Sequence, residues 1–240
     1  MKKLLLLLTL APGWAMAQQA KIRLPDLGTI EQLMASKATL KEANTRLGQA
    51  SSESITPGNA YLEFRVGEEQ WTLGFNDKHV LTDAYYNSKS VKTSGLAYED
   101  VKKASTLKDR QSVQERLGMP QRLVIRNGSE EWMFDVREGK DDKRLVVTFD
   151  LNAGMAVKKY SYYARFNDKT GVAIAPETTD LLKKGYTTPA EMEKRLGLPS
   201  HIMIDQTKEQ WEYTSDNTQL VIFFDAQSKL SDYTYRRKAQ

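Results

Sequence analysis

The chain repeats one ordered set of signals three times, and this repeat constrains its fold more than any other feature. Each copy has a helix cap, an Arg-Leu-Gly end nine residues later, and then strand-like segments that finish in a Tyr-rich stretch. Gly48, Gly118 and Gly197 mark the three copies, at spacings of 70 and 79 residues. Recurrence in a fixed order at such spacings indicates duplicated supersecondary units.

The capped helix of each copy has recognisable ends. Thr39 with Glu42 and Thr188 with Glu191 have the spacing of a capping box, and Asp109 is the corresponding N-cap of the second copy. The glycine nine residues later supplies the left-handed position that commonly ends a helix. A further helix is expected before each capped one, around residues 30–34, 98–104 and 177–184.

Strand-like sequence follows each glycine, with aromatic and β-branched residues alternating with polar ones. The first copy is the most diverged. In it, Tyr61 is expected to take the slot of Trp132 and Trp211, and Trp71 to match Leu145 and Leu220. Its first strand, around residues 51–57, is polar enough that we expect it to be absent.

These elements predict an α+β protein built from three tandem α-α-β-β-β units, some with a fourth strand. In each unit, two helices would cover one face of a small antiparallel sheet of its own. The expected units are residues 29–90 (diverged), 95–167 and 174–238, after a leader at 18–28.

The first 17 residues read as a signal peptide. Lys2 and Lys3 precede an apolar run, and Ala15-Met16-Ala17 is a small-x-small cleavage signal. The run is far shorter than the roughly 20 residues that a spanning helix needs. We therefore expect a periplasmic or secreted protein, cleaved near Ala17, with no membrane span.

The net charge and the absence of Cys limit which kinds of partner and of covalent attachment we expect. Without Lys2 and Lys3 the chain has 33 basic and 31 acidic residues, a net charge of +2, which offers no electrostatic argument for nucleic acid. The chain has no Cys, so it has no disulfides and no cysteine for lipid attachment. We therefore expect a protein that is not a lipoprotein.

The clearest copy carries several short motifs in a fixed order. They are Thr188-Pro189-Ala190-Glu191, Leu196-Gly197-Leu198-Pro199, Trp211-Glu212-Tyr213 and Phe224-Asp225. This order resembles the SmpA/OmlA family of BamE-like periplasmic domains and, more widely, the tandem units of β-lactamase-inhibitor-protein-like (BLIP-like) domains. The resemblance implies a non-catalytic protein of the cell envelope or the secreted space that works by binding other proteins.

The residues indicate no enzyme chemistry. Only His79 and His201 could serve as imidazole ligands or bases, and they lie in different copies. The chain has no nucleophile elbow, no phosphate loop and no dinucleotide fingerprint. We expect no catalytic residues, no metal and no cofactor.

Aromatic residues recur in each copy and are the candidate binding residues. One interpretation is that alternate residues pack under the helices, and this is favoured for Trp132 and Trp211. The other is that they form a platform for a protein partner, since Tyr and Trp are enriched at interfaces. The predicted partner-binding set is Tyr160, Tyr162, Tyr233, Tyr235, Trp132 and Trp211.

The sequence therefore favours an exported protein–protein interaction module, either an envelope adaptor or an inhibitor of a secreted or periplasmic protein. The alternative is a periplasmic protein that binds a small ligand or a cell-wall glycan in the clefts between units.

Overall fold

The protein folds around one continuous antiparallel sheet of 12 strands that pair in chain order. The computed structural model describes residues 22–93, 96–138, 141–164, 174–205 and 208–237. The predicted signal peptide lies outside the described residues. The strands are β1 (Ser52–Thr56), β2 (Asn59–Val66), β3 (Glu69–Phe75), β4 (Leu81–Ser88), β5 (Arg122–Arg126), β6 (Ser129–Glu138), β7 (Asp141–Asp150), β8 (Ala156–Tyr163), β9 (His201–Asp205), β10 (Glu209–Thr214), β11 (Thr218–Phe224) and β12 (Leu230–Arg237).

The prediction of three α-α-β units, each with a small sheet of its own, is wrong. β4 pairs with β5, and β8 pairs with β9, so the sheet runs without a break through both expected boundaries. Separate sheets would have left the backbone groups of these strands as open edges, and the pairing satisfies them. The result is a β-rich fold with a few short helices.

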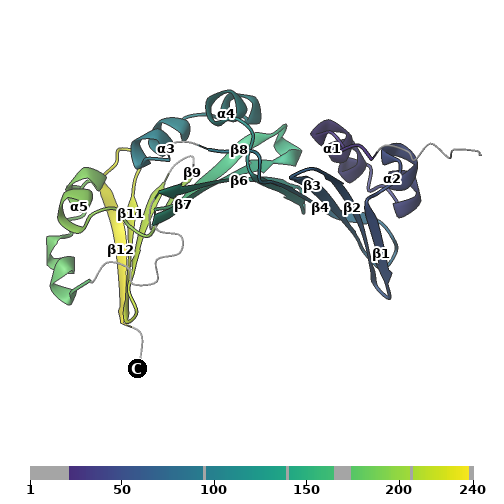
Figure 1. Ribbon diagram of the computed structural model, residues 1–240. Helices are drawn as coiled ribbons and strands as arrows, with labels where there is room; N and C mark the ends of the chain where they lie inside the picture. The colour runs from purple at the N-terminus through teal and green to yellow at the C-terminus, as the bar shows by residue number, and fades with distance from the viewer. Residues whose placement is uncertain (1–21, 94–95, 139–140, 165–173, 206–207, 238–240) are drawn as a thin grey trace, which may run out of the picture.

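The sheet curves into an arch, and the helices lie along its convex side (Figure 1). The concave side carries none of the labelled helices. The helical elements are α1 (Leu27–Ala35), α2 (Leu40–Leu47), α3 (Tyr98–Ala104), α4 (Arg110–Leu117), α5 (Pro189–Leu196) and the 3₁₀ turns η1 (Leu151–Ala153) and η2 (Pro176–Leu181).

The predicted helix ends are confirmed. The hydroxyls of Thr39 and Thr188 accept from the amides of Glu42 and Glu191, and both glutamates return a contact to the cap backbone. Asp109 caps α4 in the same position without the returning glutamate. Each cap satisfies amides that a short helix would otherwise leave unpaired.

The core lies between the helices and the convex side of the sheet. Alternate residues of β6, β7, β10 and β11 point into it, and most of them are fully buried. Burying one such side chain contributes about 1.5–3 kcal/mol, so this layer is the main stabilising feature of the fold. Its largest fully buried members are Trp132, Trp211, Tyr162, Tyr213, Phe64, Phe75, Phe134, Phe149 and Phe224.

β4, β8 and β12 pair in the same way with the strand before them. Leu81, Val157 and Leu230 lie opposite Phe75, Phe149 and Phe224, each next to a register shift. Counting from these pairs, Tyr86, Tyr162 and Tyr235 occupy one equivalent position, opposite Trp71, Leu145 and Leu220. The predicted match of Trp71 with Leu145 and Leu220 is therefore confirmed.

Two expectations for the first copy are wrong. The polar segment thought to lack a strand forms β1, which pairs with β2 through backbone groups and leaves all five of its side chains exposed. Leu62, not Tyr61, lies in the position of Trp132 and Trp211, since Leu62 pairs with Leu73 as Trp132 pairs with Val147. A shift of one residue turns a side chain to the other face, so Tyr61 is 44% exposed.

Buried carboxylates tie the helices to the sheet. Trp132 donates its indole N–H to Glu130, which is fully buried and also faces the guanidinium of Arg110 from α4 at 3.3 Å. Arg110 in turn contacts Glu31 of α1. Burial raises the pKa of Glu130 to about 7, against the lowering effect of Arg110 and Trp132. Within the described residues, no helix is both long and apolar enough to cross a bilayer.

Candidate protein-binding surface

The concave side of the sheet, which we call the open face, carries a row of cross-strand neighbours that links β6 to β11. Each member pairs directly with the next, so their side chains share one face. The apolar members alternate along their strands with fully buried core residues and are themselves only partly buried. This open-face row consists of Met133, Val146, Ser161, Met203, Gln210 and Phe223.

An ionic network borders one end of the row. Asp135 of β6 accepts from Arg144 of β7 at 2.6 Å and also contacts Arg122 of β5. Arg122 itself lies opposite Met133, so the charged groups and the row share the open face. Two guanidinium groups on one carboxylate fix these arginines beside the apolar side chains.

A stacked ring pair lies on the same face, in the neighbouring row of cross-strand pairs that includes Arg144. The rings of Tyr163 and His201 lie 4.3 Å apart at 10°, and Nδ1 of His201 is 3.7 Å from Oε2 of Glu212. Glu212 also accepts from Gln219 at 2.7 Å and Thr214 at 3.1 Å. His201 and these two hydrogen bonds lower the pKa of Glu212 to about 2, so the carboxylate is ionised wherever the protein is folded at ordinary pH.

Four of the six predicted partner-binding residues belong to the core instead. Trp132 and Trp211 are fully buried, and Tyr160 and Tyr162 are 2% and 1% exposed. The hydroxyls of Tyr160 and Tyr162 donate to backbone carbonyls of Leu107 and Leu96, on the helix side. These four residues have no surface to offer a partner, because alternation places them under the helices.

The remaining two predicted residues lie on the last strand. Tyr233 and Tyr235 are half-buried and pack against the edge of the core, opposite Ile222 and Leu220. They therefore face the helix side of β12 and are separated from the open-face row by the sheet itself.

Sequence reasoning missed the open-face residues because it followed the aromatic positions. The signal was present in the intervening positions, where Met133, Val146, Met203 and Phe223 lie among polar residues such as Ser161 and Gln210. A wet sheet face normally carries polar side chains, so apolar residues at these places are the informative ones.

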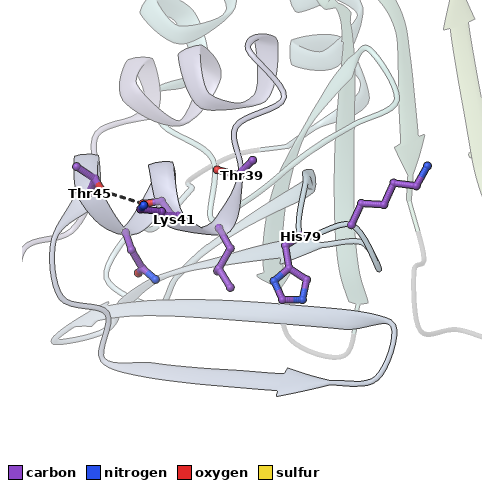
Figure 2. Close-up of a pocket in the computed structure, with 7 residues that line it drawn as sticks. Thr39, Lys41, Thr45 and His79 are labelled. Carbon is purple, nitrogen blue, oxygen red and sulfur yellow. Dashed lines mark hydrogen bonds between the residues drawn. The ribbon is translucent and has the colours of Figure 1, made fainter.

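A second surface feature is a depression between α2 and the β3–β4 turn (Figure 2). Its volume is about 730 Å³, and it is lined by the capped start of α2 together with Lys78 and His79. Thr45 donates to the carbonyl of Lys41 across its rim at 2.8 Å. Its polar side chains are mostly exposed, so water screens their charges. The depression therefore has no feature of a reactive site.

The structure groups no three potential metal ligands within the described residues. Comparison with models of known protein families and with curated protein sequences finds no match.

Proposed function

We propose that this chain is an exported, non-catalytic protein–protein interaction module that acts as an envelope adaptor or as an inhibitor of a secreted or periplasmic protein. The observation that carries the proposal is the open-face row, in which Met133, Val146, Met203 and Phe223 present partly exposed apolar surface on the helix-free side of the sheet.

The chemistry of this surface suits a protein partner. Met and Phe are enriched in the cores of interfaces, and the flexible Met side chain adapts to irregular surfaces. Arg122 and Arg144, held by Asp135, provide charged groups at the rim of the apolar row. Such a combination, an apolar centre with a polar border, is the usual anatomy of a binding patch.

The proposal is tested by capturing partners from an envelope fraction with immobilised protein. The test variant carries Met133→Lys and Met203→Lys, which place two charges in the row without filling the core. Met119→Lys is the control, because Met119 is 37% exposed just after α4, away from the open face. We expect the wild type and the control to retain one stoichiometric protein, and the test variant to lose it. Equal capture by all three would contradict the proposal.

A small-ligand or glycan-binding role is the alternative, and one feature favours it. A depression of about 370 Å³ lies between α3 and the turn before β12, and it is lined by three lysines and three carboxylates. Glycan hydroxyls hydrogen-bond well to such mixed charges. A thermal-shift screen with cell-wall fragments separates the two roles, since only the alternative predicts stabilisation that Lys208→Ala removes.

A further inference from the structure

Among the described residues, the last strand, β12, is an edge of the sheet. It has the same construction as two strands that are not edges. β4 and β8 share its register with the preceding strand, and each is continued by another strand, β5 and β9. These two internal junctions show what this type of strand accepts on its free side.

Both internal junctions place aliphatic residues on the helix side at alternate positions. Leu123 of β5 lies opposite Tyr86, and Ile202 of β9 lies opposite Tyr162. Two residues further along, Ile125 and Ile204 lie opposite Ala84 and Tyr160. On β12 the equivalent positions are Tyr235 and Tyr233, so an added strand would present its two aliphatic residues to these tyrosines.

The open-face positions add a charge rule. Asp83 pairs with Arg126 and Lys159 pairs with Asp205, which are opposite charges in both junctions. Asp232 occupies this position on β12, so a basic residue is expected opposite it on an added strand. Near the other end of β12, an acidic residue is expected opposite Arg236.

One buried group on β12 differs from its counterparts on β4 and β8. The hydroxyl of Tyr162 donates to the carbonyl of Leu96 at 2.7 Å, and that of Tyr86 to Glu69 at 3.2 Å. The equivalent hydroxyl of Tyr235 is removed from water and has no hydrogen-bond partner among the described residues. Leaving a buried polar group unpaired is costly, so Tyr235 is less well satisfied in its place than Tyr86 or Tyr162. The partners of those two hydroxyls lie outside β5 and β9, so the case for an added strand rests on the register and the charges.

We propose that β12 accepts an extended segment of another protein, paired antiparallel, with the pattern acidic–aliphatic–any–aliphatic–basic. The backbone of the segment would continue the sheet, and its two aliphatic side chains would cover Tyr235 and Tyr233. The inference rests on the proposed protein-binding role but assigns it a second surface, separate from the open-face row.

A second copy of this chain fits the edge less well. Its two edges in the described sheet are β1 and β12 itself. Antiparallel pairing of β12 with β12 around Thr234 would match Asp232 with Arg236, but it would set Tyr233 opposite Tyr235, where both internal junctions have an aliphatic residue. The register of β1 would bring Glu53 and Ile55 to the helix side. Only one of these is aliphatic, and the other would place a carboxylate against Tyr235. The segment is therefore assigned to a different protein.

The test uses the full chain and a synthetic peptide, Ser-Gly-Glu-Ile-Thr-Ile-Lys-Gly-Ser, titrated by fluorescence anisotropy, with amide hydrogen exchange read at β12. We expect binding and slowed exchange along β12. A peptide with Thr and the first Ile exchanged has the same composition but no alternation, and it should bind at least about tenfold more weakly. Absence of binding by the first peptide, or equal binding by both, would overturn the inference.

Variants locate the site. Tyr233→Ala with Tyr235→Ala should weaken binding about tenfold or more, while Tyr85→Ala, an exposed tyrosine on the open face, should not. Arg236 is exposed, so the substitution Arg236→Glu leaves the core intact. It should weaken binding of the first peptide and restore binding of a peptide in which Lys replaces the Glu at the third position. Failure of this charge exchange would contradict the proposed register.

The outcome is independent of the open-face proposal. Peptide binding that survives Met133→Lys and Met203→Lys supports the edge site even if partner capture fails. Concentration-dependent oligomers that Arg236→Glu or Tyr235→Ala abolishes would overturn the inference in favour of self-association.

Discussion

Tyr98, at the start of α3, donates a 2.6 Å hydrogen bond to Glu209 of β10, 111 residues further along the chain. Glu209 is buried and also accepts the indole N–H of Trp211 at 2.6 Å. The ring of Tyr98 meets that of Trp211 edge-on at 5.5 Å. This contact fastens a helix to a strand that sequence analysis had placed in a different unit, so it is part of what makes the sheet one body.

Removing the hydroxyl of Tyr98 should therefore loosen the junction between β8 and β9. Tyr98→Phe leaves Glu209 with one donor instead of two, and we expect a loss of about 1–2 kcal/mol in the free energy of unfolding. Glu209→Gln should cost a similar amount, and the double variant less than the sum, because both changes break one bond. Urea unfolding measures all three, with Tyr85→Phe as a control on an exposed tyrosine.

The buried carboxyl of Glu130 predicts a pH dependence of stability. Its pKa is raised to about 7 in the folded protein, mainly by burial, from an ordinary value of 4.5. Between these two pH values the unfolded chain releases the proton and the folded protein keeps it. Stability should therefore fall as pH rises through this window, by on the order of 3 kcal/mol in all.

Glu130→Gln should remove this fall, because the amide does not titrate. The measurement is urea unfolding of both proteins at about pH 4.5, 6 and 7.5. Glu212, whose pKa is lowered to about 2, acts with the opposite sign and below this window. Parallel pH profiles for wild type and variant would show that Glu130 does not titrate as described.

The turn between β5 and β6 predicts a graded cost for alanine. Gly128 has φ +73°, and a Cβ there would lie 2.8 Å from Nδ2 of Asn152. Gly67 has φ +60° with open space around it. Gly67→Ala should cost about 1 kcal/mol from backbone strain alone, and Gly128→Ala more, because Asn152 must also move. Equal melting temperatures for the two variants would contradict this reading of the turn.

Local signals in the sequence predicted the capped helices well, but the helix expected around residues 177–184 is the shorter 3₁₀ segment η2. The Thr39, Asp109 and Thr188 caps and the range of α3 are confirmed, since capping depends on neighbouring residues alone. The continuity of the sheet was not predictable in this way. It depends on β4 and β8 finding partners more than 30 residues away, and nothing within either strand specifies that pairing.

The candidate site was misjudged for a related reason. Alternation correctly separates Trp132 from Met133, but it does not say which set faces the helices. The predicted partner-binding set includes Trp132 and Trp211, for which packing under the helices is the favoured interpretation, and burial confirms that interpretation and extends it to Tyr160 and Tyr162. Only the positions of the helices on the convex side decide between the two faces.

Site-specific photo-crosslinking tests the central claim, that the open face binds a protein partner. A benzophenone amino acid would replace Met203 on the open face or, as the matched control, Met119 beside α4 on the helix side. After irradiation in an envelope fraction, we predict one adduct of defined mass from position 203 and none from position 119. An adduct from position 119 with none from position 203 would contradict the account.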